Sequence, residues 1–459
     1  MKKRHSKGRK VKVVSMDSLK QLNLNAAGLD VGDDEIWACV PEGRDDSSVR
    51  VFGTFTVDLY ALADWLADCG VDTVAMESTG VYWIPAFEVL EERGFEVCLV
   101  NARHVKKIAG RKTDILDCQW LQQLHTYGLL RASFRPPDEI CALRAIGRQR
   151  DTLIRYRAKH IQHMQKALQQ MNLKLTNVLS DITGTTGMAI IRAILEGERN
   201  PQRLAAFRNA HCAKSEEEIA KSLQGNWREE HLFAIKQAVE FYEYYTHQIA
   251  ACDQELERRY QQFEPQVDVI VQPLKPNKRQ RKKPEGNAPG FDLRTYLYQA
   301  TGVDLAQIDG IDALTAHNVL CEIGLDMNKW PTVKHFTSWM CLAPFEDKSG
   351  GRLLRSGVKK TRNRANLALR KAAQSLHHSH SALGAFYRRI AARHGSSTAI
   401  AATAHKLARI IYHMLKYKVE YIDLGQDYYD VRARRKAIHN LKRRAKQLGF
   451  EVIPVSTSP

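Results

Sequence analysis

The chain of 459 residues has no C-x-x-C pair among its nine cysteines, which are scattered between Cys39 and Cys341. Zinc ribbons and disulfide-stapled small domains need cysteines in pairs, so the sequence disfavours both classes. Isolated cysteines in apolar stretches are typical of core residues in a reducing compartment. We therefore expect a cytoplasmic protein without structural disulfides.

The sequence also lacks any apolar run long enough to span a bilayer. The basic segment MKKRHSKGRK begins the sequence, but no apolar stretch follows it as in a secretory signal. We expect residues 1–22 to form a basic arm, which either contacts phosphates or is simply solvated. No membrane partner is expected.

Acidic residues are in the minority. Lys and Arg total 69 against 51 Asp and Glu, which gives a net charge of +18, and the pI is about 9.4. Such a balance favours a polyanionic partner, and nucleic acid is the commonest. The hydrophobic content of 44% indicates a globular chain, and the length predicts two or three domains.

Residues 23–135 have the pattern of an α/β domain. Three short strand-like runs, LNLNAAGLDVG, EIWACV and VRVFGTF, come first. Helical and strand patterns then alternate: VDLYALADWLADCG, VDTVAME, WIPAFEVLEERG, FEVCLV and a helix over 113–126. Three strands followed by alternating elements predict a mixed sheet covered by helices.

After Pro136-Pro137 the pattern becomes helical. Long helical runs over 138–172 and 228–262 predict an antiparallel, coiled-coil-like arm within residues 136–263, or else a plain helical subdomain. Residues 264–292 are rich in Pro, Lys and Arg and predict a basic linker, which either grips phosphate or is a solvated spacer. A compact α-helical domain is expected over 293–425, followed by a basic tail over 426–459.

Four acids carry the chemistry that we expect of the first domain. Asp30 lies at the end of the first strand and Glu77 at the end of the fourth, where α/β sheets place active sites. Asp114 and Asp117, spaced by three, lie on one face of a helix. Gathered carboxylates need a cation to coexist, and their oxygens suit Mg²⁺ or Mn²⁺.

Each acid alone is more often a turn former or part of a solvated helix face. Their order is the more specific signal, because RNase H-like nucleases use a first-strand Asp, a fourth-strand Glu and later helical acids within one α/β domain. Two metal ions in such a site can activate the attacking oxygen and stabilise the leaving oxygen of a phosphodiester.

The segment LAPFEDKSGGRLLRSGVKKTRNRANLALRKAAQS combines a small nucleophile with many cations. Ser349 precedes Gly350-Gly351 in an expected loop, and guanidinium groups nearby can fork onto phosphate. A phosphate grip or a turn is the alternative interpretation, and Ser356 is the alternative nucleophile on chemistry alone. The candidate phosphate contacts of this segment are Arg352, Arg355, Lys359, Lys360, Arg362 and Arg364.

Upstream, QIDGIDALTAHNVLCEIG is similar to a helix-hairpin-helix. Gly310 would let the backbone bend so that amides and a helix N-terminus meet a phosphate, with a structural turn as the alternative.

Taken together, GLDVG, AMESTGVYW, VNARHVKKIAGRKTDILDCQWL and the segment around Ser349 resemble the DEDD transposases of the insertion-sequence IS110 family, which includes the Piv-type invertases. The resemblance extends from about residue 24 to about residue 420. It implies a RuvC-like N-terminal domain with an RNase H fold, in which Asp30, Glu77, Asp114 and Asp117 bind the metal. The basic residues before Asp114 are further candidate nucleic-acid contacts, namely Arg103, Lys106, Arg111 and Lys112.

The resemblance also implies a role for Ser349. Family members have a serine five residues beyond a proline, as Ser349 follows Pro344 here, and this serine joins transiently to the DNA strand end. The family further implies a homo-oligomer, a dimer of dimers, in which two subunits share each catalytic centre. A bridge RNA would pair with donor and target DNA. A structure-selective nuclease such as a junction resolvase is the alternative function, and a non-enzymatic nucleic-acid-binding protein is a second one.

Overall fold

The computed structural model describes residues 20–78, 80–101, 114–276, 286–359, 361 and 363–453. The chain divides into two compact units, Met1–Arg135 and Pro136–Pro459, which are described separately below. None of the helices in the described ranges is both long and apolar enough to cross a membrane. All nine cysteines fall within these ranges and are free thiols, as expected.

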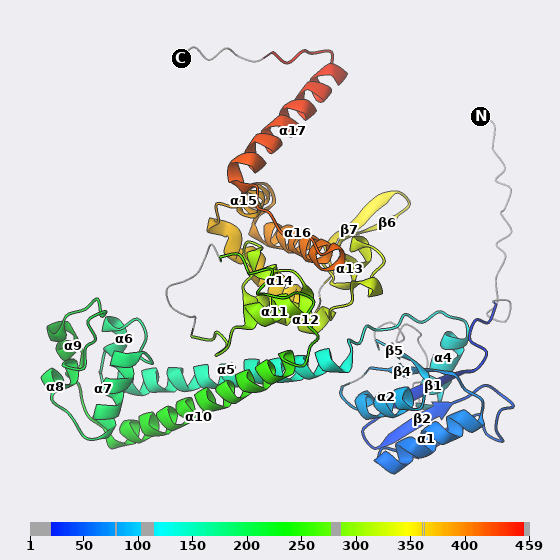
Figure 1. The fold of residues 1–459 in the computed structure, drawn as a ribbon, viewed down its shortest axis with the longest axis horizontal. Coiled ribbons are helices and arrows are strands. Elements are labelled where there is room, and N and C mark those ends of the chain that lie inside the picture. The colour runs from blue at the N-terminus through cyan, green and yellow to red at the C-terminus, as the bar shows by residue number, and fades with distance from the viewer. Residues whose placement is uncertain are drawn as a thin grey trace, which may run out of the picture. The chain divides into compact units, whose positions relative to one another are not determined.

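The first unit contains a mixed sheet whose strands lie in the order β3-β2-β1-β4-β5 (Figure 1). The strands β1, β2 and β3 are antiparallel neighbours, whereas β1, β4 and β5 run parallel. Their bounds are β1 Ala26–Val31, β2 Glu35–Cys39, β3 Val49–Gly53, β4 Thr73–Glu77 and β5 Glu96–Val100.

Helices cover both faces of this sheet. Helices α1 (Thr56–Asp68) and α2 (Trp83–Glu92) pack on one face, where their apolar side chains join Leu29 and Met76 in one core cluster. Helix α4 (Asp114–Thr126) packs on β1, β2 and β4 from the other face. The predicted mixed α/β sheet is therefore confirmed, because alternating apolar positions and glycine stops marked its elements clearly in the sequence.

Two long helices, α5 (Asp138–Gln170) and α10 (Glu229–Tyr260), begin the second unit and run antiparallel along each other (Figure 1). Buried Arg150 of α5 forms an ion pair with buried Asp253 of α10, and the same guanidinium donates to the Asn287 carbonyl. Short helices close the far end of this hairpin around an apolar core: α6 Leu175–Val178, α7 Thr185–Leu195, α8 Pro201–Ala205 and α9 Glu216–Ser222.

A helical bundle follows, as expected for the C-terminal region. Its helices are α11 Leu293–Thr301, α12 Ala313–Ile323, α13 Val333–Trp339, α14 Arg364–Ser375, α15 Ala382–His394 and α16 Ser396–Tyr417, with 3-10 turns at Leu305–Gln307, Met327–Lys329 and Leu376–His378.

A buried polar contact ties this bundle to the long helices. The hydroxyl of Tyr260 on α10 lies 2.7 Å from Nδ1 of His317 on α12. His317 is only 2% exposed. Burial, and secondarily the charge of Arg150, lowers its pKa to about 4, so the imidazole is neutral near pH 7.

The C-terminal region is not purely α-helical. Residues Pro344–Ser349 and Arg352–Val358 form an antiparallel hairpin, β6–β7, between α13 and α14. The expected basic tail over 426–459 is partly helical. Residues Gly425–Gln447 form helix α17. Ala, Arg, Lys, Gln and Leu dominate this segment and have high helix propensity, which a charge count alone does not reveal.

Candidate active site

Asp30 is the last residue but one of β1, and Glu77 is the last residue of the neighbouring parallel strand β4. In the register of β1 and β4, Gly28 pairs with Ala75 and Leu29 with Met76. The next step along both strands places Asp30 beside Glu77. In-register side chains of adjacent strands point to the same face, so both half-buried carboxyl groups share one face at the carboxyl edge of the sheet.

That face is the one covered by α4. Gly28, two residues before Asp30, has no room for a side chain, because a Cβ there would lie 2.3 Å from the Cys118 carbonyl oxygen and 2.4 Å from the Gln122 amide nitrogen. Side chains alternate along a strand, so Gly28 and Asp30 face the same way. A single glycine thus sets how closely the acid-bearing helix approaches the strand that carries Asp30.

The contacts of α4 also fix its direction. At its C-terminal end, the His125 Nε2 atom lies 2.8 Å from Thr73 Oγ1, at the start of β4. The Thr126 carbonyl accepts a 2.8 Å hydrogen bond from the Leu22 amide, which precedes β1. Helix α4 therefore runs opposite to β1 and β4, and its first turn lies toward the edge where Asp30 and Glu77 end.

Asp114 and Asp117 belong to that first turn. Carboxylates at a helix N-terminus are stabilised by the helix dipole, so this is a favourable place for both. The side chain of Asp114 lies outside the described residues, and Asp117 is half-buried. Among the side chains that the structure describes, no group of three or more His, Cys, Asp or Glu is already arranged around a metal position. The fit to a metal rests on the donor chemistry, since these carboxylate oxygens are what Mg²⁺ and Mn²⁺ prefer.

A pair of cysteines lies beside this edge. A hydrogen bond with Cys39 of β2, burial and the nearby charge of Asp30 all raise the pKa of the Cys118 thiol. Cys118 follows Asp117 directly, and its carbonyl oxygen is one of the atoms that a Cβ at Gly28 of β1 would meet, so this part of α4 lies beside the strand that carries Asp30. Sequence reasoning treated both cysteines only as core residues.

Ser349 is the last residue of β6 and does not lie in a loop. It pairs with Arg352, and only Gly350 and Gly351 connect the two strands. Their φ angles are +56° and +79°, so the connection is a type I′ turn, which requires a left-handed backbone at both positions. The serine is exposed near the tip of the hairpin.

Of the predicted phosphate contacts that the structure describes, Arg352 lies at this tip, Arg355 lies along β7, and Lys359 and Arg364 lie beyond the base of the hairpin. Arg352 and Lys359 are exposed. Arg355 lies 3.5 Å from Asp347 and stacks over the Phe345 ring at 5.2 Å. Arg364, at the start of α14, forms a 3.5 Å ion pair with Asp151 of α5.

A groove of about 580 Å³ with mixed polar and apolar walls lies at the base of the hairpin. It lies where α14 and α16 both begin, and Lys359 and Arg370 are the two cations among its lining residues. Sequence reasoning missed its hydroxyl groups, because Thr361 is far in sequence from Ser397 and Thr398. The polar lining residues are Lys359, Thr361, Asn366, Arg370, Ser397 and Thr398.

Two family models match the chain. One, described as Transposase, matches residues 27–173, and the other, described as Transposase IS116/IS110/IS902 family, matches residues 302–388. Together they cover about half of the chain. The chain belongs to the IS110 family of transposases. It is thus a DNA transposase or recombinase, an enzyme that cuts DNA, and its four acids lie in the first match and Ser349 in the second. No individual curated protein matches the sequence.

Within this IS110-family chain, Gly310 has a packing reason to be glycine. Its φ is +86°, and a Cβ there would lie 2.8 Å from the Ala372 carbonyl oxygen of α14. Asp312 then caps α12 by accepting from the Thr315 amide. The phosphate-binding role of Gly310 stays a prediction, as does the helix-hairpin-helix.

Other predicted contacts lie outside the described residues: Arg103, Lys106, Arg111, Lys112, Lys360 and Arg362.

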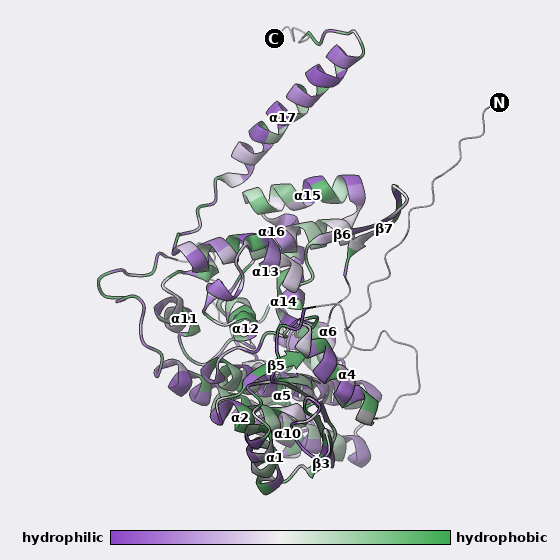
Figure 2. Cartoon of the chain, turned by 90° about the vertical axis from the view of Figure 1, so that its right-hand side faces the viewer, coloured by the Kyte–Doolittle hydropathy of each residue, from purple (hydrophilic) through white to green (hydrophobic). Residues whose placement is uncertain are grey.

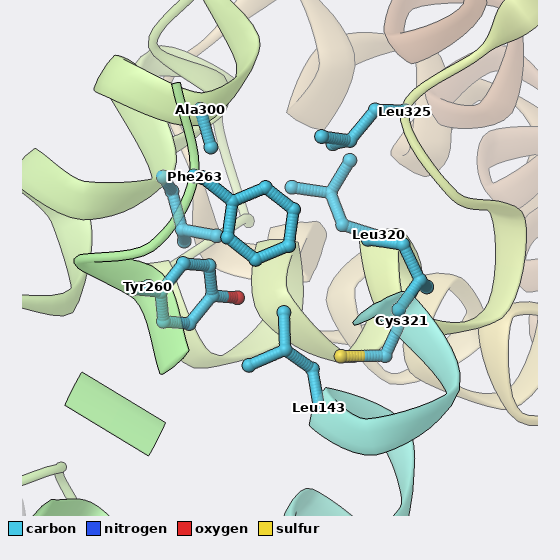
Figure 3. Close-up of a pocket in the computed structure, with 9 residues that line it drawn as sticks. Leu143, Tyr260, Phe263, Ala300, Leu320, Cys321 and Leu325 are labelled. Carbon is cyan, nitrogen blue, oxygen red and sulfur yellow. The ribbon is translucent and has the colours of Figure 1, made fainter. Parts of the chain in front are cut away.

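An enclosed cavity elsewhere in the transposase is structural. It holds only about 10 Å³ of free space between α5, the end of α10, α11 and α12. Figure 3 shows Leu143, Phe263 and Leu320 turned toward one another around it, with the Tyr260 hydroxyl and the Cys321 sulfur at one side. A space this small and this apolar is an ordinary packing defect between helices, and it offers no substrate site.

Proposed function

We propose that this transposase cuts and rejoins DNA with a composite centre, in which Asp30, Glu77, Asp114 and Asp117 hold Mg²⁺ or Mn²⁺ and Ser349 is the nucleophile. The observation that carries the proposal is the meeting of two in-register strand-end carboxylates with the first turn of α4 at one sheet edge. The strand order β3-β2-β1-β4-β5 supports a RuvC-like fold for this unit.

Each part of the centre has a distinct task. Bound divalent ions neutralise the phosphate and stabilise the charge that develops on its oxygens. The carboxylates fix the position of those ions, and Gly28 fixes the position of α4. The exposed cations of the hairpin, Arg352 and Lys359, bind phosphates that flank the scissile bond.

Ser349 conserves the phosphodiester energy. Its hydroxyl loses a proton as Oγ bonds to phosphorus, the bond from phosphorus to a deoxyribose oxygen breaks, and that oxygen takes up a proton. The DNA end is then held as a phosphoserine. A hydroxyl of another strand attacks the same phosphorus, releases Ser349 and restores a phosphodiester, so the exchange consumes neither water nor cofactor.

The two halves of the centre belong to different units of the chain, the carboxylates to the first and Ser349 to the second. We propose that different subunits supply them within a dimer of dimers. Helices α5 and α10 offer a long surface for such pairing. A bridge RNA that pairs with donor and target DNA would supply sequence specificity, and the net charge of +18 suits an RNA–DNA cargo.

The test is to trap the covalent complex. The transposase acts on a plasmid carrying the ends of its element, and denatured products are examined for protein-linked DNA. Asp30→Asn and Glu77→Gln should each lower the rate of linkage at least about a thousand-fold, about 4 kcal/mol of transition-state stabilisation, and chelation of Mg²⁺ should act likewise.

Ser349→Ala should abolish linkage and rejoining while DNA binding persists. Ser356→Ala, on the facing strand of the same hairpin, is the matched control and should retain both. Continued strand transfer by Ser349→Ala would refute the serine mechanism, and cleavage without rejoining in both serine variants would favour a junction resolvase. Binding that is indifferent to Asp30→Asn, with no metal-dependent cleavage in the unmodified chain, would identify a non-enzymatic binder. Sequencing of RNA that copurifies from the host tests the bridge RNA, which the absence of a discrete RNA would contradict.

A further inference from the structure

Helix α17 carries the densest positive charge in the second unit's described C-terminal part. Between Asp430 and Glu451 the sequence has eight Lys and Arg and no acid. The helix spans 23 residues and buries none of its side chains. It also lies beyond both family matches, which end at residues 173 and 388. Figure 2 shows it coloured mainly as hydrophilic.

The root of α17 is firmly held. Gln426 accepts a 2.7 Å hydrogen bond from Arg388 of α15, and Asp430 lies 3.6 Å from Arg389. The ring of Tyr429 packs edge-on against Phe386 and lies under the Lys406 ammonium at 5.4 Å. These contacts fix where the helix starts and leave the rest of it exposed beyond α15 (Figure 1).

The cations of α17 are ordered by the helical repeat. Spacings of three and four place most of them in one stripe along the helix. We call this set the basic stripe: Arg432, Arg435, Lys436, Lys442, Arg443 and Lys446. Arg434 and Arg444 have other helical phases and lie off the stripe.

The stripe continues onto the body of the second unit. Lys406 of α16 is partly buried, and its pKa is lowered by that burial and by the charges of Arg432 and Arg409. Like charges held this close repel one another, and a bound polyanion relieves the repulsion. The anchored root therefore joins a cluster of cations on α16 to a line of cations on α17.

We propose that α17 is a duplex-DNA-binding arm whose basic stripe lies against the phosphates of one groove. An isolated regular helix fits the major groove of B-form DNA, whereas the major groove of A-form RNA is too narrow and deep to admit it. At about 1.5 Å per residue the helix is about 35 Å long, close to one turn of the duplex. Helix α17 carries none of the residues proposed for the catalytic centre, and its contacts go to phosphates and so add affinity without reading sequence.

The alternative occupant is a second copy of the chain. Val431, Ile438 and Leu441 form an apolar stripe beside the basic one and are 51%, 44% and 55% exposed. Charge favours DNA, because the eight cations that follow Asp430 outnumber the two acids of α17 and would repel the same helix of another copy.

The test compares two double variants of the full-length protein with equal charge change. Arg435→Gln/Lys442→Gln removes two cations of the basic stripe, and Arg434→Gln/Arg444→Gln removes two cations off it. The probe is a labelled duplex DNA of about 30 base pairs, titrated at several salt concentrations. Loss of two phosphate contacts should weaken binding about 30-fold at about 0.15 M salt and flatten the salt dependence by about two units of slope. The control variant should change affinity by less than about threefold.

Other outcomes overturn the proposal. Equal effects of the two variants would mean that α17 attracts DNA only by its overall charge and not through the basic stripe. Unchanged DNA affinity in both variants would exclude a contact between α17 and DNA. If Ile438→Gln/Leu441→Gln separates copies of the chain while the stripe variant binds DNA normally, the helix is a protein interface. Phosphoserine formation at saturating DNA should be normal in the stripe variant, so failure of this proposal is distinguishable from failure of the catalytic one.

Discussion

The surroundings of Asp30 and Glu77 are far more buried than those of Ser349. Asp30 and Glu77 lie near the carboxyl ends of two strands whose residues Leu29 and Met76 are completely buried, and α4 packs against these strands through backbone contact at Gly28. Ser349 stands on a hairpin whose residues are exposed or half-buried along both strands. The core of the first unit therefore holds the two carboxylates in place, whereas the hairpin that carries Ser349 has little packing of its own.

The difference has a physical consequence. An isolated two-stranded hairpin is only marginally stable in water, so the role that we propose for Ser349 requires contacts from another surface to hold the hairpin in place. Adjacent Leu353 and Leu354 on β7 are 55% and 70% exposed and are suited to such contacts. The proposed nucleophile on an exposed hairpin and the proposed metal ligands on a packed sheet edge agree with a centre that is complete only after assembly on DNA.

Gly28→Ala should have the largest effect, because it would disturb the packing that holds the carboxylates of the first unit. The added methyl group would overlap backbone atoms of Cys118 and Gln122, which cannot move without displacing α4. We expect destabilisation of the first unit by more than about 3 kcal/mol and loss of DNA linkage, measured by chemical denaturation and by the covalent assay. Gly286→Ala is the control, because nothing lies within 4 Å of its Cβ position. A stable, active Gly28→Ala protein would show that α4 is not held at that distance.

The stability of the helical bundle that carries the hairpin should depend on pH through His317. The folded state lowers the pKa of His317 to about 4, against about 6.5 when unfolded. Protonation therefore favours the unfolded chain, and the stability is full above pH 6.5 and is lost as pH falls toward 4. The loss should reach about 3 kcal/mol, measured as the unfolding free energy against pH.

His317→Gln provides the comparison for that titration. Glutamine can still accept from the Tyr260 hydroxyl but has no proton to gain in this range. The variant should lose stability less steeply than the unmodified chain between pH 6.5 and 4.5. Identical slopes would mean that the His317 contact does not report the folding of this body.

The sequence predicted the rigid half of the site better than the exposed half. The runs ending at Asp30 and Glu77 are apolar and bounded by turn residues, so both their strand character and their shared edge followed from pattern alone. The segments PFEDKS and RLLRSGV have no such apolar alternation, and the expected loop and helices were wrong there. The Gly350-Gly351 pair was the available signal, since two glycines between short runs are typical of a type I′ hairpin.

Tertiary proximity set the other limit on prediction from sequence. The close approach of Gly28 to Cys118 and the groove shared by Thr361 and Ser397 depend on how helices dock, which no local pattern encodes. Helix α17 was missed for a different reason, because its charge suggested a solvated tail while its residue types favoured a helix.

A smaller effect is expected at the turn beside Ser349. Gly350→Val places a β-branched residue at a φ of +56°, which costs about 1–2 kcal/mol in the left-handed region. The hairpin should open and the rate of rejoining should fall about tenfold, while the unfolding free energy of the second unit stays within about 0.5 kcal/mol, because the hairpin is not part of its core. Gly350→Asn is the control, since asparagine tolerates this conformation and should retain activity. Equal activity of the two variants would remove the turn from the mechanism.

The smallest expected effect distinguishes two roles of Arg355, which either stabilises the hairpin or binds phosphate. Its ion pair with Asp347 is exposed, and such pairs contribute at most about 1 kcal/mol, so Arg355→Ala should barely alter stability. If Arg355 binds phosphate, Arg355→Ala should flatten the salt dependence of DNA binding by about one unit of slope, whereas Asp347→Asn should leave that slope unchanged or steepen it. If it only braces the hairpin, both variants should weaken binding equally, because each breaks the same pair. The sign of the Asp347→Asn effect therefore decides whether the exposed hairpin carries cations for its own stability or for its DNA.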